Sequence, residues 1–239
     1  MTNPTLTHLY VLLDRSGSMQ AIKADAEVAI DAFVAEQRRA PGECAMTLAQ
    51  FDSRYEEVYV NRPVAEVPPL HLEPRGMTAL FDAVGVFVTA AGERLASLPE
   101  HERPGTVIVV MVTDGMENTS TVWAQDAVRG LVEQQSSTYS WDFLYLGGDQ
   151  DAVAVGGGIG VPRERSMSFE RGRVRAAIAA ASGKVAAARA AAASGLAPRG
   201  GPPAAGVHRR PALRMREALI STPPPPQRHT FRTLLKVCL

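Results

Sequence analysis

The sequence predicts an α/β fold: a doubly wound, mostly parallel sheet with helices on both faces and one antiparallel edge strand. Short apolar runs alternate with segments of helical periodicity over residues 6–194, the order that produces a parallel sheet covered on both faces. The run at 107–112, VIVVMV, is continuous and rich in β-branched residues, as in a central buried strand. Two strand-like runs at 44–51 and 55–60 lie so close together that they predict a hairpin.

The first half of the chain supplies a strand, a helix and this hairpin. Residues 9–13, LYVLL, form a short apolar run that ends at Asp14 and predicts a buried strand. Apolar residues then recur with helical spacing over 19–38. A turn at 52–54 joins the two hairpin strands, and a proline-rich stretch at 63–74 predicts a loop.

The second half continues the alternation of helices and strands. It predicts helices at 78–95 and 123–135, strands at 107–112 and 141–146, a short helix from 149, a short strand within 163–169 and an alanine-rich helix at 174–194. From Pro198 the pattern stops. We therefore expect one domain over residues 1–197 and a basic, proline-rich, disordered tail over 198–239.

The formal net charge of zero conceals a division of charge along the chain. Residues 1–170 hold 12 Lys and Arg against 24 Asp and Glu, whereas residues 171–239 hold 13 against 1. The basic tail could bind nucleic acid or the acidic body of the domain itself weakly, but a solvated extension is the simpler interpretation. Two cysteines, no secretory signal and no apolar run of membrane-spanning length predict a cytoplasmic protein with no membrane partner.

A D-x-S-x-S motif follows the first predicted strand. Asp14, Ser16 and Ser18 place one carboxylate and two hydroxyls on a tight loop, and oxygen ligands of this kind suit Mg²⁺. Gly17 would let the loop turn so that both hydroxyls face the same way. The alternative is a cluster of helix N-cap residues, where serine is common. We favour the metal site because composition alone predicts only roughly 0.03 such motifs in the chain.

Two further residues are expected to lie beside this motif. Thr78 begins a predicted helix, and Asp114 follows the central predicted strand. Both therefore belong to the carboxyl edge of the sheet, where open α/β sheets bind ligands. Each alone is an ordinary helix-start or turn residue, so their common placement is what makes them informative.

With these residues in place, the chain resembles a von Willebrand factor type A (VWA) domain with a metal-ion-dependent adhesion site (MIDAS), and is similar to bacterial intracellular VWA proteins. The resemblance covers about residues 5–195 and rests on LDRSGSM, RGMTALFDAV and VVMVTDGMEN. It implies a Rossmann-like VWA fold and a site for Mg²⁺, with Mn²⁺ or Ca²⁺ as alternatives. The implied ligands are Asp14, Ser16, Ser18, Thr78 and Asp114. A Glu or Asp side chain of a protein partner would complete the coordination, which is binding and not catalysis.

Other functions stay open from the sequence. Some VWA proteins that resemble this chain act as adaptors beside AAA+ ATPases or in stress signalling, which is the second interpretation. A metal-dependent phosphoester hydrolase with Asp14 as nucleophile is the third. Because the chain carries no standard enzyme signature, we expect no catalytic activity.

Four neighbouring residues have roles that the sequence leaves open. Arg15 is expected to be solvated, or else to attract an acidic partner. Asp82, one turn after Thr78, could orient a site hydroxyl or interact with the helix dipole. Glu117 and Asn118 could line the rim of the site or belong to a turn.

Overall fold

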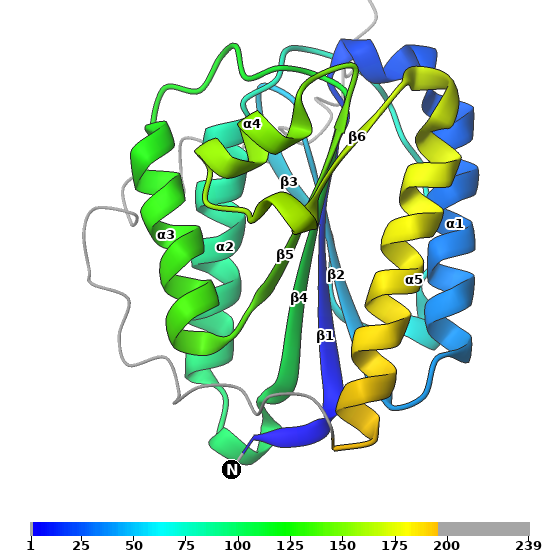
Figure 1. Cartoon of the computed structure of the whole chain (residues 1–239), viewed down its shortest axis with the longest axis vertical. Coiled ribbons are helices and arrows are strands. Elements are labelled where there is room, and N and C mark those ends of the chain that lie inside the picture. Colours follow the sequence, from blue (N-terminus) through cyan, green and yellow to red (C-terminus); the bar gives the residue numbers. More distant parts are fainter. Residues whose placement is uncertain (1, 196–239) are drawn as a thin grey trace, which may run out of the picture.

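One sheet lies between two layers of helices (Figure 1). The structure is a computed structural model that describes residues 2–195. Its strands are β1 (Asn3–Asp14), β2 (Glu43–Phe51), β3 (Tyr55–Pro63), β4 (Pro104–Thr113), β5 (Asp142–Gly148) and β6 (Ser166–Phe169). Its α-helices are α1 (Lys23–Arg39), α2 (Leu80–Ser97), α3 (Gln125–Tyr139), α4 (Ala152–Gly158) and α5 (Val174–Ala193). Among residues 2–195, no helix is both long and apolar enough to cross a membrane.

The strand order β3-β2-β1-β4-β5-β6 confirms the predicted doubly wound fold. Neighbouring strands are parallel except β2 and β3, which form the antiparallel edge hairpin. From β1 the chain adds strands first on one side and later, with β4, on the other. Ligands bind at the carboxyl ends of strands at such a switch point. Asp14 ends β1 and Asp114 follows β4, so two of the predicted site residues lie at the switch point.

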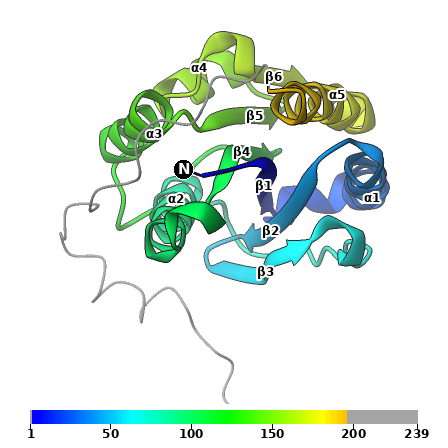
Figure 2. The ribbon, with the colours of Figure 1, turned by 90° about the horizontal axis from the view of Figure 1, so that it is seen from below.

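Both faces of the sheet are buried. Helices α1 and α5 cover one face, and α2 and α3 cover the other (Figure 2). In β1, Leu9, Val11 and Leu13 pack into the core beneath α1 and α5. Tyr10 and Leu12 alternate with them and pack into the core beneath α2 and α3. Side chains alternate between the two faces of a strand. A strand that is buried on both faces must therefore be continuously apolar, as predicted for residues 9–13.

Several element boundaries differ from the predictions by a few residues, and two helices are examples. The helix expected over 19–38 starts as a 3-10 turn, Gly17–Ala21, and becomes α-helical only from Lys23. The helix expected over 123–135 runs instead from Gln125 to Tyr139. The predicted tail over 198–239 lies outside the described residues, so the domain boundary near 197 stays a prediction.

Candidate metal site

Three loops meet at the carboxyl edge of β1 and β4, and each carries residues predicted for the site. Asp14 is the last residue of β1, and Ser16 and Ser18 follow it around the start of the 3-10 turn. Thr78 lies two residues before α2, and Asp114 directly follows β4. All of these side chains are buried except that of Ser18, which is partly exposed.

Side-chain oxygens from these loops surround Gly115. A Cβ atom built on Gly115 would lie only 2.5 Å from Thr78 Oγ1. It would also lie 3.3 Å from Asp14 Oδ2 and 3.3 Å from Ser16 Oγ. The three oxygens therefore face one small volume, which stays open only because residue 115 has no side chain.

Hydrogen bonds join the remaining two predicted residues to this group. Ser16 Oγ and Ser18 Oγ lie 3.0 Å apart, and Ser18 Oγ donates to Asp114 Oδ1 at 2.6 Å. The other carboxylate oxygen, Asp114 Oδ2, is buried and has no hydrogen-bond partner. The structure thus brings all five predicted residues together and leaves one buried carboxylate oxygen without a donor, an arrangement that calls for a ligand or ion.

Burial works against the negative charge of the two aspartates. It raises the pKa of Asp14 from 3.8 to about 6, and the charge of Asp114 adds a smaller contribution in the same direction. Hydrogen bonds from the Thr113 hydroxyl at 2.5 Å and the Ser16 amide at 2.6 Å offset part of this effect. Burial also raises the pKa of Asp114, against the hydrogen bond from Ser18. A cation would stabilise two buried carboxylates in this position.

Thr113 is a part of the site that the sequence analysis missed, whereas Asn118 was expected at the rim of the site or in a turn and is bonded to Thr78. The Thr113 hydroxyl donates to Asp14 Oδ2 and accepts from the Gly115 amide at 3.1 Å. The Thr78 amide donates to Asn118 Oδ1 at 2.9 Å, and the Asn118 amide donates to the Thr78 carbonyl at 3.1 Å. The only signal for Thr113 was a hydroxyl directly before the D-G pair, so its role could not be recognised before the loops were placed.

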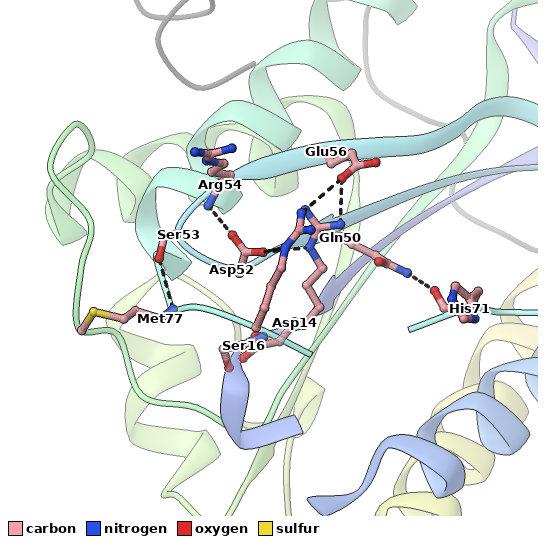
Figure 3. Close-up of polar contacts among 11 residues, drawn as sticks. Asp14, Ser16, Gln50, Asp52, Ser53, Arg54, Glu56, His71 and Met77 are labelled. Carbon is pink, nitrogen blue, oxygen red and sulfur yellow. Dashed lines mark hydrogen bonds and ion pairs between the residues drawn. The ribbon is translucent and has the colours of Figure 1, made fainter. Parts of the chain in front are cut away.

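An ion-pair cluster built on the buried pair of Arg15 and Asp52 supports the loop after β1 from the hairpin turn (Figure 3). Asp52 Oδ2 accepts from Arg15 Nε at 3.0 Å and from Arg75 Nε at 2.9 Å. Arg15 also pairs with Glu56 Oε2 at 2.7 Å. Both expectations for Arg15 are wrong, because its side chain is only 7% exposed and is engaged inside the fold. The partners come from the β2–β3 hairpin, which local sequence patterns do not connect with residue 15.

Two other carboxylates organise the loop between β4 and α3. Asp82 accepts hydrogen bonds of 2.7–2.9 Å from the backbone amides of residues 121–123. The suggestion that it orients a site hydroxyl is wrong, since both of its oxygens serve these amides. Glu117 accepts from the amides of Phe81 and Ser120 at 2.9 and 2.7 Å. Burial alone would raise the pKa of Glu117, but its hydrogen bonds outweigh burial and lower it.

The donor set fits a hard divalent cation. Within residues 2–195, no group of three or more His, Cys, Asp or Glu side chains could hold a metal ion. A metal at the switch point would therefore depend on hydroxyl oxygens beside the two aspartates. The oxygens around Gly115 and Asp114 Oδ2, which accepts no hydrogen bond, are of the kind that Mg²⁺ prefers.

Comparison with known proteins gives matches among solved structures alone. No protein-family model matches the sequence, and no curated protein matches it either. Proximal thread matrix protein 1 from the mussel byssus matches with a TM-score of 0.55 at 12% identity, covering 78% of this chain and 47% of that one. A von Willebrand factor type A structure from Catenulispora acidiphila matches with a TM-score of 0.51 at 15% identity, covering 78% and 43% of the two chains.

A second structure of the mussel protein has a zinc-occupied MIDAS motif. It matches with a TM-score of 0.50 at 14% identity, covering 77% of this chain and 47% of that one. This chain therefore spans less than half the length of each of these solved structures. At such low identity the likeness shows the fold, which is the one that the sequence resemblance implied.

Proposed function

We propose that this chain, whose fold is that of a VWA domain, is a metal-dependent protein-binding module. It binds a divalent cation, preferably Mg²⁺, and through that cation the carboxylate of a Glu or Asp side chain on a protein partner. The observation that carries the proposal is the convergence of oxygens from Thr78, Asp14 and Ser16 on the volume beside Gly115.

The residues of the site contribute either a negative charge or a neutral oxygen. Asp14 and Asp114 supply two negative charges, which a divalent cation would neutralise. Ser16, Ser18 and Thr78 supply neutral oxygens, so the candidate ligands add no more negative charge than the cation carries. A bound cation would supply a coordination position that a partner's carboxylate can enter in place of water. The zinc in the MIDAS motif of the mussel protein supports a divalent metal at this position of the fold.

Two exposed methionines support a protein as the partner. Met77 and Met116, which are 51% and 68% exposed, flank the site next to Thr78 and Gly115. By contrast, Met19, Met46 and Met111 are buried in the core. Met77 and Met116 are each adjacent in the chain to a residue of the site, and methionine adapts its shape to different partners. The pair would contact apolar side chains beside the partner's acidic residue.

The hydrogen bonds of Asp14 argue against a catalytic role. Its Oδ1 accepts from the Ser16 amide and its Oδ2 accepts from the Thr113 hydroxyl. A carboxylate that attacks a phosphoester must direct an oxygen at the reacting atom. Here both oxygens accept hydrogen bonds from the loops of the site, and Oδ2 also faces the proposed metal position beside Gly115, so we propose binding without catalysis.

Metal binding is tested by isothermal titration of the purified chain with Mg²⁺ and Mn²⁺. We expect one binding site in the unaltered protein, none in Asp14→Ala, and unchanged binding in Asp126→Ala, which removes an exposed carboxylate on α3. The same three proteins, immobilised with Mg²⁺ or with EDTA, then test partner capture from lysate. Capture that survives both EDTA and Asp14→Ala would show that the partner binds elsewhere.

A further inference from the structure

Asp114 Oδ2 is a buried carboxylate oxygen to which none of the other candidate metal ligands donates a hydrogen bond. The Asp114 side chain is fully buried, and its Oδ1 is satisfied by Ser18 at 2.6 Å. Its Oδ2 has no hydrogen-bond donor. A buried carboxylate oxygen without a donor is costly, so a nearby positive charge is expected to compensate it.

Arg171 supplies that charge from the connection between β6 and α5. Its Nε lies 3.7 Å from Asp114 Oδ2, within ion-pair range but too far for a good hydrogen bond. The same Nε lies 3.1 Å from Asp149 Oδ2, and the Arg171 amide donates to Asp149 Oδ1 at 3.2 Å. Asp149 therefore holds both the backbone and the guanidinium of Arg171 beside the metal site.

The backbone geometry after β5 places these charges side by side. A Cβ on Gly148 would lie 2.9 Å from the Cβ of Asp114 and 2.8 Å from the Phe169 ring, so only glycine permits this close approach. The next residue, Asp149, has a φ of 49° and donates its amide to the Phe169 carbonyl at 2.9 Å. The loops after β4, β5 and β6 are thus packed together with Asp114 and Arg171 facing each other.

We infer that Arg171 is a built-in counter-cation that competes with the divalent metal for Asp114 and lowers the metal affinity of the site. The inference rests on the proposed function. A guanidinium and a divalent cation repel each other when both approach one carboxylate. The Arg171 side chain is 49% exposed, so it can move toward solvent while Asp149 keeps its backbone in place. Metal binding must then displace Arg171 from Asp114, and this displacement sets the metal concentration at which the site fills.

Titration with Mn²⁺, followed by the loss of the free Mn²⁺ signal in electron paramagnetic resonance, tests this role. Arg171→Ala should bind Mn²⁺ about fivefold more tightly than the unaltered protein, the size expected for a half-exposed ion pair. Arg171→Lys should stay near the unaltered value because it keeps the charge. Arg173→Ala is the matched control: Arg173 is 77% exposed and pairs with Glu170, which is 82% exposed.

The outcomes separate the inference from the proposed function. Tighter Mn²⁺ binding in Arg171→Ala, with no change in Arg173→Ala, supports the competing role. Equal or weaker Mn²⁺ binding by Arg171→Ala overturns the inference. Weaker binding would mean that Arg171 stabilises the metal-binding arrangement of the loops. If the unaltered protein binds no Mn²⁺, the metal site itself is wrong and the inference falls with it. Circular dichroism of each variant confirms that the fold is intact before the comparison is made.

Discussion

The Ser18 hydroxyl donates a 2.6 Å hydrogen bond to Asp114 Oδ1, although the two residues are 96 positions apart in the sequence. This bond joins the loop after β1 to the loop after β4 across the switch point of the sheet. It also helps to hold the Asp14 and Asp114 carboxylates as neighbours in a buried position. Two neighbouring buried carboxylates destabilise the fold when no metal is bound. Changes at this site should therefore alter the free energy of unfolding.

Replacing Asp14 with Asn should stabilise the metal-free protein. Burial raises the pKa of Asp14 from 3.8 to about 6, so holding it ionised at pH 7.5 costs about 3 kcal/mol of unfolding free energy. Asparagine removes the charge and can still accept from the Ser16 amide. Urea denaturation in EDTA should show Asp14→Asn to be the more stable protein, while added Mg²⁺ should stabilise only the unaltered chain.

The pH dependence of this difference has a defined sign. Because the pKa of Asp14 is higher in the folded state, its stabilising contribution is complete below pH 3.8 and is lost as the pH rises through about 6. The stability advantage of Asp14→Asn should therefore shrink as the pH is lowered from 7.5 to 4. His8, whose pKa is lowered to about 4 by burial, destabilises both proteins on acidification and cancels in the comparison. An advantage independent of pH would contradict a charge-based cause.

Metal affinity should weaken in acid. The metal-free site must lose the Asp14 proton before a cation can bind, so protons compete with Mg²⁺ below about pH 6. We expect the apparent dissociation constant for Mg²⁺ to be nearly constant from pH 8 to 7 and to rise toward tenfold per pH unit below 6. Calorimetric titrations at several pH values would detect this change. A constant affinity down to pH 5 would exclude Asp14 as a ligand.

Asp52→Ala should destabilise the fold far more than Glu56→Ala, although both carboxylates pair with Arg15. The Asp52 side chain is 4% exposed, and its removal leaves the buried Arg15 charge poorly compensated, at a cost of about 3–5 kcal/mol. The Glu56 side chain is 56% exposed, so its loss should cost less than about 1 kcal/mol. Chemical denaturation of the two variants compares them directly. Equal losses would show that the buried pair does not support the loops.

The alternation of strands and helices was predictable because it depends on local patterns. The strand at 9–13 and its Asp14 end could be recognised from a continuous apolar run alone. Arg15 could not be understood in this way, since its partners Asp52 and Glu56 come from a hairpin that pairs with β1 only in the folded chain. The same holds for Asp82, whose partners are backbone amides some 39–41 positions away. Sequence spacing indicates which residues lie at the same edge of the sheet. The hydrogen-bond and ion-pair partners of those residues depend on tertiary contacts.

The exposed methionines should matter for the partner and not for the metal. A double variant, Met77→Ser with Met116→Ser, removes apolar surface that is 51% and 68% exposed in the two residues. We expect unchanged Mg²⁺ affinity, because neither side chain belongs to the candidate ligand set, and reduced Mg²⁺-dependent capture of partner from lysate. Full capture by the double variant would place the apolar contact elsewhere.

The most direct test of the metal site is a calorimetric Mg²⁺ titration of Gly115→Ala beside Gly130→Ala. A Cβ at residue 115 would lie 2.5 Å from Thr78 Oγ1 and would fill the volume that the site oxygens face, whereas a Cβ at Gly130 in α3 would meet nothing within 4 Å. We predict that Gly115→Ala folds but binds no Mg²⁺, and that Gly130→Ala binds Mg²⁺ like the unaltered protein. Unchanged Mg²⁺ binding by Gly115→Ala would contradict a metal site at this switch point.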